Sequence, residues 1–181
     1  MHPSIEEAPV PREVIPLRER PIDVALISFF LVNICFVTYM VDAEQLLIPD
    51  TSHFTYPPWP PRAMVDLFHW YGRTFDPLLM ARPPFWKATI WMDVLLFGPF
   101  YIAAVFAFAS GREWIRIPAI IWATALITNV VIILGEELFG QFATPHPAMV
   151  IGSNAPWVIV PSYVIARMWR DAHPFTRPQA A

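Results

Sequence analysis

The residues from Phe85 to Phe108 form a long apolar run with an aspartate, Asp93, inside it. A run of this length is sufficient to cross a lipid bilayer as a helix. An aspartate within such a helix costs roughly 2.5–3.5 kcal/mol on insertion scales, so it usually faces the interior of a helix bundle. Asp93 is therefore a candidate site residue, and the alternative is a structural polar contact with another helix.

The composition indicates an integral membrane protein. Of the 181 residues, 56% are hydrophobic and only 15% are charged, whereas about 25% are charged in an average soluble domain. The net charge of −3 comes without a run of basic residues, which argues against a nucleic-acid partner. The single cysteine, Cys35, excludes a disulfide within the chain.

Four apolar runs predict an all-α integral membrane fold, a bundle of four transmembrane helices. The expected spans cover residues 22–48, 85–109, 114–139 and 148–169. They form one domain over residues 21–171. We expect residues 1–20 to be a flexible cytoplasmic tail and residues 172–181 to be a second cytoplasmic tail.

The distribution of basic residues predicts the orientation of the helices, because cytoplasmic loops carry an excess of lysine and arginine. The two tails and the short loop near residue 112 hold most of the basic side chains, whereas the loop at 49–84 holds few. Both termini are therefore expected in the cytoplasm. The membrane would be the plasma membrane of a bacterium or the endoplasmic reticulum of a eukaryote.

Proline or glycine lies close to a polar residue in several of the expected spans. Gly98 and Pro99 follow Asp93, and Pro156 follows Asn154. Breaks of this kind are tolerated in a membrane where protein or a cavity satisfies the backbone, although both residue types are also frequent in spanning helices. We expect an intramembrane ligand cavity within the bundle.

Three acids form the first group of candidate ligand-binding residues. Asp42 lies near the end of the first span, Asp93 lies in the second, and Asp76 belongs to the loop between them. Their positions in the chain predict that all three lie near the same membrane leaflet. Three ionised carboxylates close together repel one another, so either one of them carries a proton or a cation lies among them. From spacing alone Asp76 is more typical of a turn, because it precedes a proline.

A second group of candidates is polar or aromatic and lies in the third and fourth spans. Asn129 and Glu136 are seven residues apart and share a helix face, as do Asn154 and Trp157 at a spacing of three. They suit the wall of a pocket, or alternatively contacts between helices. The histidines show no metal-ligand spacing, and we expect no cofactor.

Two stretches of the sequence resemble the EXPERA superfamily of membrane proteins. They are Trp70–Leu79, which contains Asp-Pro-Leu-Leu, and Trp114–Ile121, which contains Trp-Ile-Arg-Ile-Pro-Ala-Ile-Ile. The likeness covers about residues 22–170 and is strongest to the sigma-2 receptor (transmembrane protein 97) branch. It implies a fold of four or five helices with a pocket that opens towards the bilayer. The same superfamily includes the emopamil-binding protein, a sterol isomerase.

The resemblance also implies roles for individual residues. Acids matching Asp42 and Asp93 bind the amine of a ligand in the sigma-2 branch, and an acid matching Asp76 supports the first of them. The second-helix acid of that branch is usually the longer glutamate. Asn154 and Trp157 are more similar to the isomerase, whose catalytic histidine is replaced here by Thr38.

These observations predict a multi-pass membrane protein that binds a sterol-like or other polycyclic lipid, or a lipophilic amine, through paired acids. The first alternative is a cofactor-free acid–base isomerase of sterol double bonds, or a terpenoid cyclase, with Asp42 and Asp93 as catalytic residues. The second is a lipid-handling partner protein without chemistry. The sequence leaves the ligand and the oligomeric state open, a homodimer included.

Overall fold

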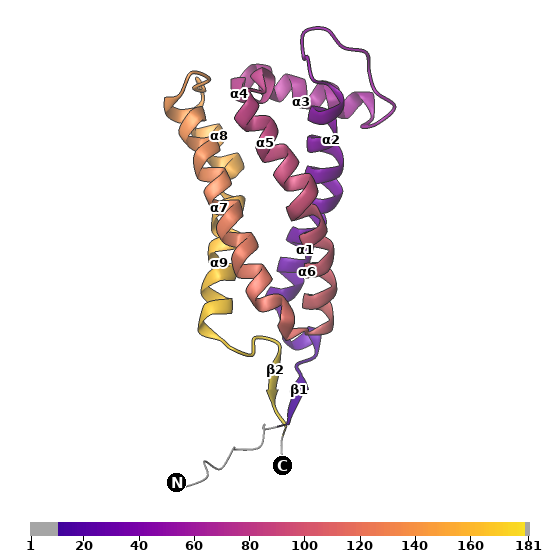
Figure 1. Ribbon diagram of the computed structural model, residues 1–181, viewed down its shortest axis with the longest axis vertical. Helices are drawn as coiled ribbons and strands as arrows, with labels where there is room; N and C mark the ends of the chain where they lie inside the picture. The colour runs from indigo at the N-terminus through magenta and orange to yellow at the C-terminus, as the bar shows by residue number, and fades with distance from the viewer. Residues whose placement is uncertain (1–10, 180–181) are drawn as a thin grey trace, which may run out of the picture.

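The computed structural model describes residues 11–179, and within this part of the chain four long helical columns stand side by side (Figure 1). The columns are Pro21–Leu47, Pro84–Ser110, Glu113–Phe139 and Pro147–Arg170. Each column is long and apolar enough to cross a membrane. The predicted all-α bundle of four membrane-spanning helices is therefore confirmed.

All four columns consist of more than one helical segment. The first contains α1 (Pro21–Val32), a π-helical segment (Asn33–Asp42) and α2 (Ala43–Leu47); the second contains α5 (Pro84–Met92), a π-helical segment (Asp93–Phe97) and α6 (Gly98–Ser110). The third contains a 3₁₀ turn (Glu113–Ile115) and α7 (Arg116–Phe139), and the fourth contains α8 (Pro147–Asn154) and α9 (Pro156–Arg170). Shorter elements at the two ends are β1 (Arg12–Val14), a 3₁₀ turn (Leu17–Glu19), α3 (Arg62–Phe75), α4 (Pro77–Ala81) and β2 (Thr176–Pro178).

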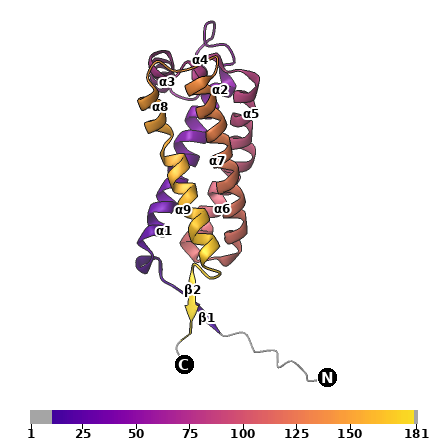
Figure 2. The ribbon, with the colours of Figure 1, turned by 90° about the vertical axis from the view of Figure 1, so that its left-hand side faces the viewer.

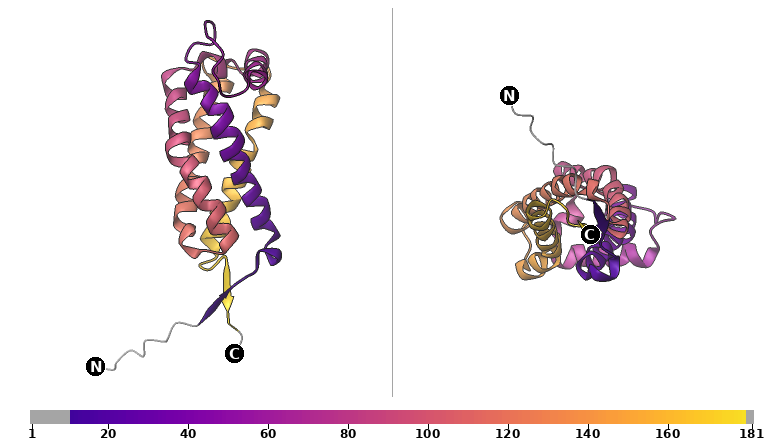
Figure 3. Two further views of the ribbon diagram at one scale, coloured as in Figure 1. Left: turned by 90° about the vertical axis from the view of Figure 1, so that its right-hand side faces the viewer. Right: turned by 90° about the horizontal axis from the view of Figure 1, so that it is seen from below.

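The columns associate as two pairs. α7 packs along α9, and α1 packs along α6 (Figures 2 and 3). The outward faces are apolar, and Leu95, Ile121 and Ile159 are among the most exposed side chains. In a membrane such side chains face lipid, which explains why polar residues are concentrated on the inside of the bundle.

The second column widens into a π-helix at Asp93. Pro99 lacks an amide hydrogen and cannot donate the α-helical bond to the carbonyl of Leu95. A lost bond of this kind is a common cause of irregular helix geometry, and π-helical turns occur frequently at functional sites. The irregular part of the second column thus begins at the buried Asp93 itself.

The half of the bundle near the chain ends is filled by aromatic side chains. Phe30 is fully buried and makes edge-to-face contacts with Phe108 and Trp122, at ring-centroid distances of 5.3 and 5.4 Å. The ring of Phe100 stacks on Trp122 at 4.8 Å. Aromatic pairs of this geometry contribute beyond simple burial of area, so this half is a packed core.

The two chain ends are joined at this same end of the molecule. β1 and β2 pair antiparallel, with Val14 opposite Thr176. Beyond the strands, the fully buried Asp23 binds both Arg20 and Arg167. The expectation of a flexible tail is therefore wrong for residues 12–20, because this strand and this ion cluster hold them in place. The expectation for residues 1–10 and 180–181 lies outside the described residues.

The opposite end is closed by α3 and α4, and a buried ionic network joins them to the first column. Arg82 donates from Nη2 to both carboxylate oxygens of Glu44, at 2.9 and 2.7 Å. Nε2 of His69, on α3, lies 2.8 Å from the same carboxylate. All three side chains are buried, so the network fixes α3 above the bundle.

Candidate functional site

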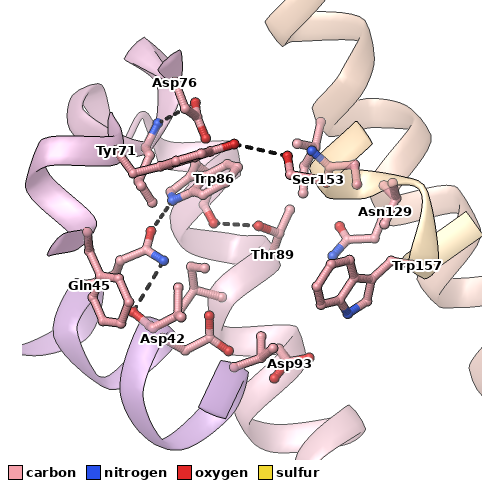
Figure 4. Close-up of a pocket in the computed structure, with 18 of the residues that line it drawn as sticks. Asp42, Gln45, Tyr71, Asp76, Trp86, Thr89, Asp93, Asn129, Ser153 and Trp157 are labelled. Atoms are coloured by element: carbon pink, nitrogen blue, oxygen red, sulfur yellow. Dashed lines mark hydrogen bonds between the residues drawn. The ribbon is translucent and has the colours of Figure 1, made fainter. Parts of the chain in front are cut away.

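A cavity of about 450 Å³ lies in the half of the bundle that α3 covers (Figure 4). Its volume falls in the range of roughly 300–1,000 Å³ that is typical of small-molecule sites. All four columns contribute to its wall, together with α3 and the turn before α4. The six ligand-binding residues predicted from the sequence all line it: Asp42, Asp76, Asp93, Asn129, Asn154 and Trp157. Their placement is compatible with that prediction, and their role stays a prediction.

Asp42 and Asp93 lie together at the inner end of the cavity (Figure 4). The first belongs to the π-helical segment of the first column and the second begins the π-helical segment of the second. Their carboxyl groups face each other closely enough to share a hydrogen bond. Asp42 is 3% exposed and Asp93 9% exposed, so the pair is held in a largely water-excluded place.

The two carboxyl groups of this pair have different hydrogen-bond partners. Thr38 donates from Oγ1 to Oδ2 of Asp93 at 2.6 Å, and the hydroxyl of Tyr101 donates to Oδ1 at 3.3 Å. Oδ2 of Asp42 is buried and accepts no hydrogen bond from any of the described residues. A carboxylate without a donor is costly to bury, so Asp42 requires either a proton or a ligand group.

Asp76 lies at the other end of the cavity and pairs with Glu137 of α7. Its Oδ1 also accepts a 3.0 Å bond from the amide of Leu79 and caps the start of α4. Burial raises the pKa of Asp76 above its ordinary value. The resemblance implied that Asp76 supports Asp42, but the structure pairs Asp76 with Glu137 instead, because α4 holds it at the opposite end.

Glu137 was not recognised as a cavity residue from the sequence, which favoured its neighbour Glu136. Glu137 is 1% exposed and lines the cavity, whereas Glu136 lies outside it and accepts a bond from the amide of Phe142. The residues of α7 that line the cavity include Leu126, Ile133 and Glu137, at positions i, i+7 and i+11 of the helix. That stripe points into the cavity, and Glu136 is turned about 100° away from Glu137 on the helix.

The fourth column contributes Asn154 and Trp157 to the wall. Nδ2 of Asn154 lies 3.5 Å from Oε2 of Glu137 and 3.0 Å from the carbonyl of Val150. The indole of Trp157 donates to Oδ1 of the fully buried Asn33 at 2.7 Å. This bond connects the fourth column to the first across the bundle and fixes the plane of the indole ring.

The roof of the cavity is held by two further hydrogen bonds that the sequence did not suggest. The indole of Trp86 donates to the amide oxygen of Gln45, and the hydroxyls of Tyr71 and Ser153 are 2.9 Å apart (Figure 4). Tyr71 comes from α3, so α3 contacts the last column as well as the first. The hydroxyl partner of Tyr71 lies 82 residues away in the sequence, so no local pattern could suggest this contact.

The fold and the cavity define a class of protein: a multi-pass integral membrane protein with an acid-lined cavity between its helices. The comparison with known families gives a narrower identity. The EXPERA family (EXPanded EBP superfamily) matches residues 63–168, which is more than half of the chain. The chain therefore belongs to the EXPERA family, and the resemblance noted in the sequence is confirmed.

Individual relatives of this chain are sigma receptors. The Sigma intracellular receptor 2 of Xenopus tropicalis is 32% identical over 143 residues, which is 73% of this chain and 79% of that protein. The receptor of the same name from Macaca fascicularis is 28% identical over 173 residues, 88% of this chain and 93% of that protein. The human protein of this name is 30% identical over 122 residues, 60% and 69% of the two chains.

Proposed function

We propose that this protein binds a sterol-like or other polycyclic lipid that carries an amine or another donor group, and that Asp42 and Asp93 receive this group. The observation that carries the proposal is that Asp42 lines an apolar cavity while its buried Oδ2 has no donor among the described residues. A ligand ammonium or hydroxyl would supply the missing partner.

Charge supports the same proposal. Neither Asp42 nor Asp93 forms an ion pair with a lysine, arginine or histidine within residues 11–179. Asp93 already accepts bonds from Thr38 and Tyr101, so a bound cation would sit between this oriented carboxyl group and the free oxygen of Asp42. Charge-assisted hydrogen bonds of this kind are about twice as strong as neutral ones.

The rest of the cavity supports a bulky apolar ligand. Phe36, Ile90, Val130 and Trp157 are among the residues of its wall. Apolar walls with a few polar groups are typical of small-molecule sites, in which the polar groups fix the orientation of the ligand. The names of the relatives agree with a receptor role, since each is called a sigma intracellular receptor.

Binding to purified protein tests the proposal. A radiolabelled lipophilic amine and a radiolabelled sterol would be titrated against the wild type, Asp42→Asn and Asp93→Asn, with the exposed Asp66→Asn as the matched control. We expect the two cavity variants to lose about tenfold or more in amine affinity, and the control to bind normally. Unchanged affinity in both cavity variants would overturn the proposal and favour a lipid-handling partner without a ligand-binding role.

A second candidate function is isomerisation of a sterol double bond, or cyclisation of a terpenoid. It is favoured by the unequal surroundings of the paired acids, because one protonated carboxyl can donate to an alkene carbon while its ionised neighbour removes a proton from an adjacent carbon. Turnover of a sterol in deuterated water would place one carbon-bound deuterium in the product. A panel of sterols and terpenoids that yields no product would exclude this candidate.

We further propose that the end of the bundle with both chain termini faces the cytoplasm. Eight of the twelve basic residues belong to this end, and four belong to the end covered by α3. This asymmetry is what the positive-inside tendency predicts. In sealed vesicles of known orientation, protease should remove an epitope fused to the C-terminus only when the cytoplasmic face is outside; the opposite result would reverse the assignment.

A further inference from the structure

The cavity has a second pair of acids, which the proposed amine site does not use. Asp76 and Glu137 are 6% and 1% exposed, both line the cavity, and their carboxyl groups pair with each other. Like the first pair, they form no ion pair with a basic side chain in the described part of the chain. Two carboxyl groups held together in a buried place repel each other when both are ionised, and a cationic group of a ligand between them would relieve this repulsion.

Asp76 lies at the opposite end of the cavity from Asp42 and Asp93 (Figure 4), and Glu137 lines the same cavity. Asp93 lies nine residues into the second column, which begins at Pro84, so a rise of 1.5 Å per residue puts it about 13 Å from the covered end. Asp76 and Glu137 belong to that end: the first caps α4, and the second lies two residues before the end of α7. The two acid pairs are therefore roughly 10 Å apart along the bundle.

A third polar group points into the same cavity without a partner. Asn129 is 9% exposed, lines the cavity, and its side chain is drawn towards the interior in Figure 4. Among the described residues its amide has no side-chain hydrogen bond, although other buried amides such as Asn33 are satisfied. The amide atoms of Asn129 are not fully enclosed by the protein, so a polar group of a ligand in the cavity can bond to them. Together with the unpaired oxygen of Asp42, this amide indicates that the cavity is shaped around a polar ligand.

We propose that the cavity is a two-ended site for an elongated polycyclic diamine, with one ammonium group between Asp42 and Asp93 and the other at Asp76 and Glu137. The inference rests on the proposed amine site and extends it by naming the second anchor and the ligand class. The rigid apolar body of the ligand lies along the wall between the two acid pairs, and Asn129 bonds to a polar group on that body. Asn154, 3.5 Å from Glu137, holds the second anchor in position.

Matched steroidal amines test the proposal. The probes are an androstane with an amino group at each end of the ring system and the two androstanes that carry only one of these groups. Affinities would be measured by calorimetry or radioligand competition on wild type, Glu137→Gln and the neighbouring Glu136→Gln. The control is closely matched, because Glu136 lies outside the cavity and glutamine still accepts the bond from Phe142.

We expect the diamine to bind wild type and Glu136→Gln about tenfold or more tightly than the better monoamine, and this advantage to disappear in Glu137→Gln. The monoamine that binds at Asp42 should bind all three proteins equally.

If neither monoamine binds wild type, the proposed amine site itself is wrong. If a monoamine binds but the diamine has no advantage, or keeps its advantage in Glu137→Gln, only the second anchor is overturned. A melting curve of each variant shows whether the fold is intact, and Asp76→Asn provides an independent variant of the same anchor.

Discussion

Oγ1 of Thr38 donates a 2.6 Å hydrogen bond to Oδ2 of Asp93, between two columns and across 55 positions of sequence. This bond makes the two acids of the pair unequal. Asp93 has a hydrogen-bond donor, whereas Oδ2 of Asp42 has none among the described residues. Thr38 also occupies the position at which the resemblance to the isomerase would require a histidine. A hydroxyl can orient a carboxylate, but it cannot replace imidazole as a base at neutral pH.

Replacing Thr38 by valine should destabilise the protein, because a buried carboxylate loses its shortest hydrogen bond. Hydrogen bonds to charged groups contribute about 1.5–3 kcal/mol, and we expect a loss in this range in the free energy of unfolding. Thr38→Ser retains the hydroxyl and is the matched control. Unfolding in detergent measures both variants, and an equal loss in the two would assign the effect to packing of the methyl group.

The stability of the protein should depend on the ionisation of Asp76. Burial raises the pKa of Asp76 in the folded state above its ordinary value of 3.8, so the folded protein holds this proton more tightly than the unfolded chain does. Its contribution to stability is therefore complete below the ordinary value and is lost as the pH rises through the raised pKa. Asp76→Asn keeps an oxygen for the Leu79 amide and should flatten this dependence. Unfolding midpoints between about pH 4 and about pH 8 measure the slope, and an equally steep slope in the variant would contradict the assignment.

The ionic network under α3 should be sensitive to the loss of one partner. Arg82→Gln leaves the fully buried Glu44 without its bidentate cation, and removing one member of a buried ion pair typically costs about 3–5 kcal/mol. The exposed Arg73→Gln is the control. Adding Glu44→Gln to the first variant should recover part of the loss. If the double variant is no more stable than Arg82→Gln alone, the unpaired charge is not the cause.

The joined chain ends should be an ordered part of the fold. Phe175 is fully buried, packs against Phe108 at 5.0 Å and lies beside the guanidinium groups of Arg20 and Arg167. Phe175→Ala should reduce the free energy of unfolding by about 3–5 kcal/mol. Phe139→Ala removes a ring that is 87% exposed and should have a much smaller effect in detergent. Equal effects of the two substitutions would argue against an ordered end.

The parts of the fold that depend on local composition were predictable from the sequence. Apolar runs of bilayer length predicted the four columns, since their outward faces contact lipid and cannot carry polar groups. Asp42 and Asp93 stood out for the same reason, because an acid in such a run is costly unless it faces the interior. Both line the cavity in the structure.

The parts that depend on long-range packing were not predictable. Glu136 and Glu137 are adjacent and chemically identical, and only the orientation of α7 against the other columns decides which of them enters the cavity. The pairing of β1 with β2 joins residues such as Glu13 and Arg177, which lie at opposite ends of the chain, and neither strand has an apolar pattern of its own. The contact of Asp76 with Glu137 was not predictable either, because the partner of a capping residue is set by tertiary structure, and the role of Asp76 in binding stays a prediction.

The β1–β2 pairing also has a practical consequence. Arg12 lies opposite Pro178 in the sheet, so the chain leaves the bundle at nearly the same point in both directions, at the end remote from the cavity (Figure 3). The two halves of a split fluorescent protein, one fused to each terminus, would be held side by side without touching the ligand site. Their complementation would report whether the ends of the chain stay joined in a living membrane while the cavity fills and empties.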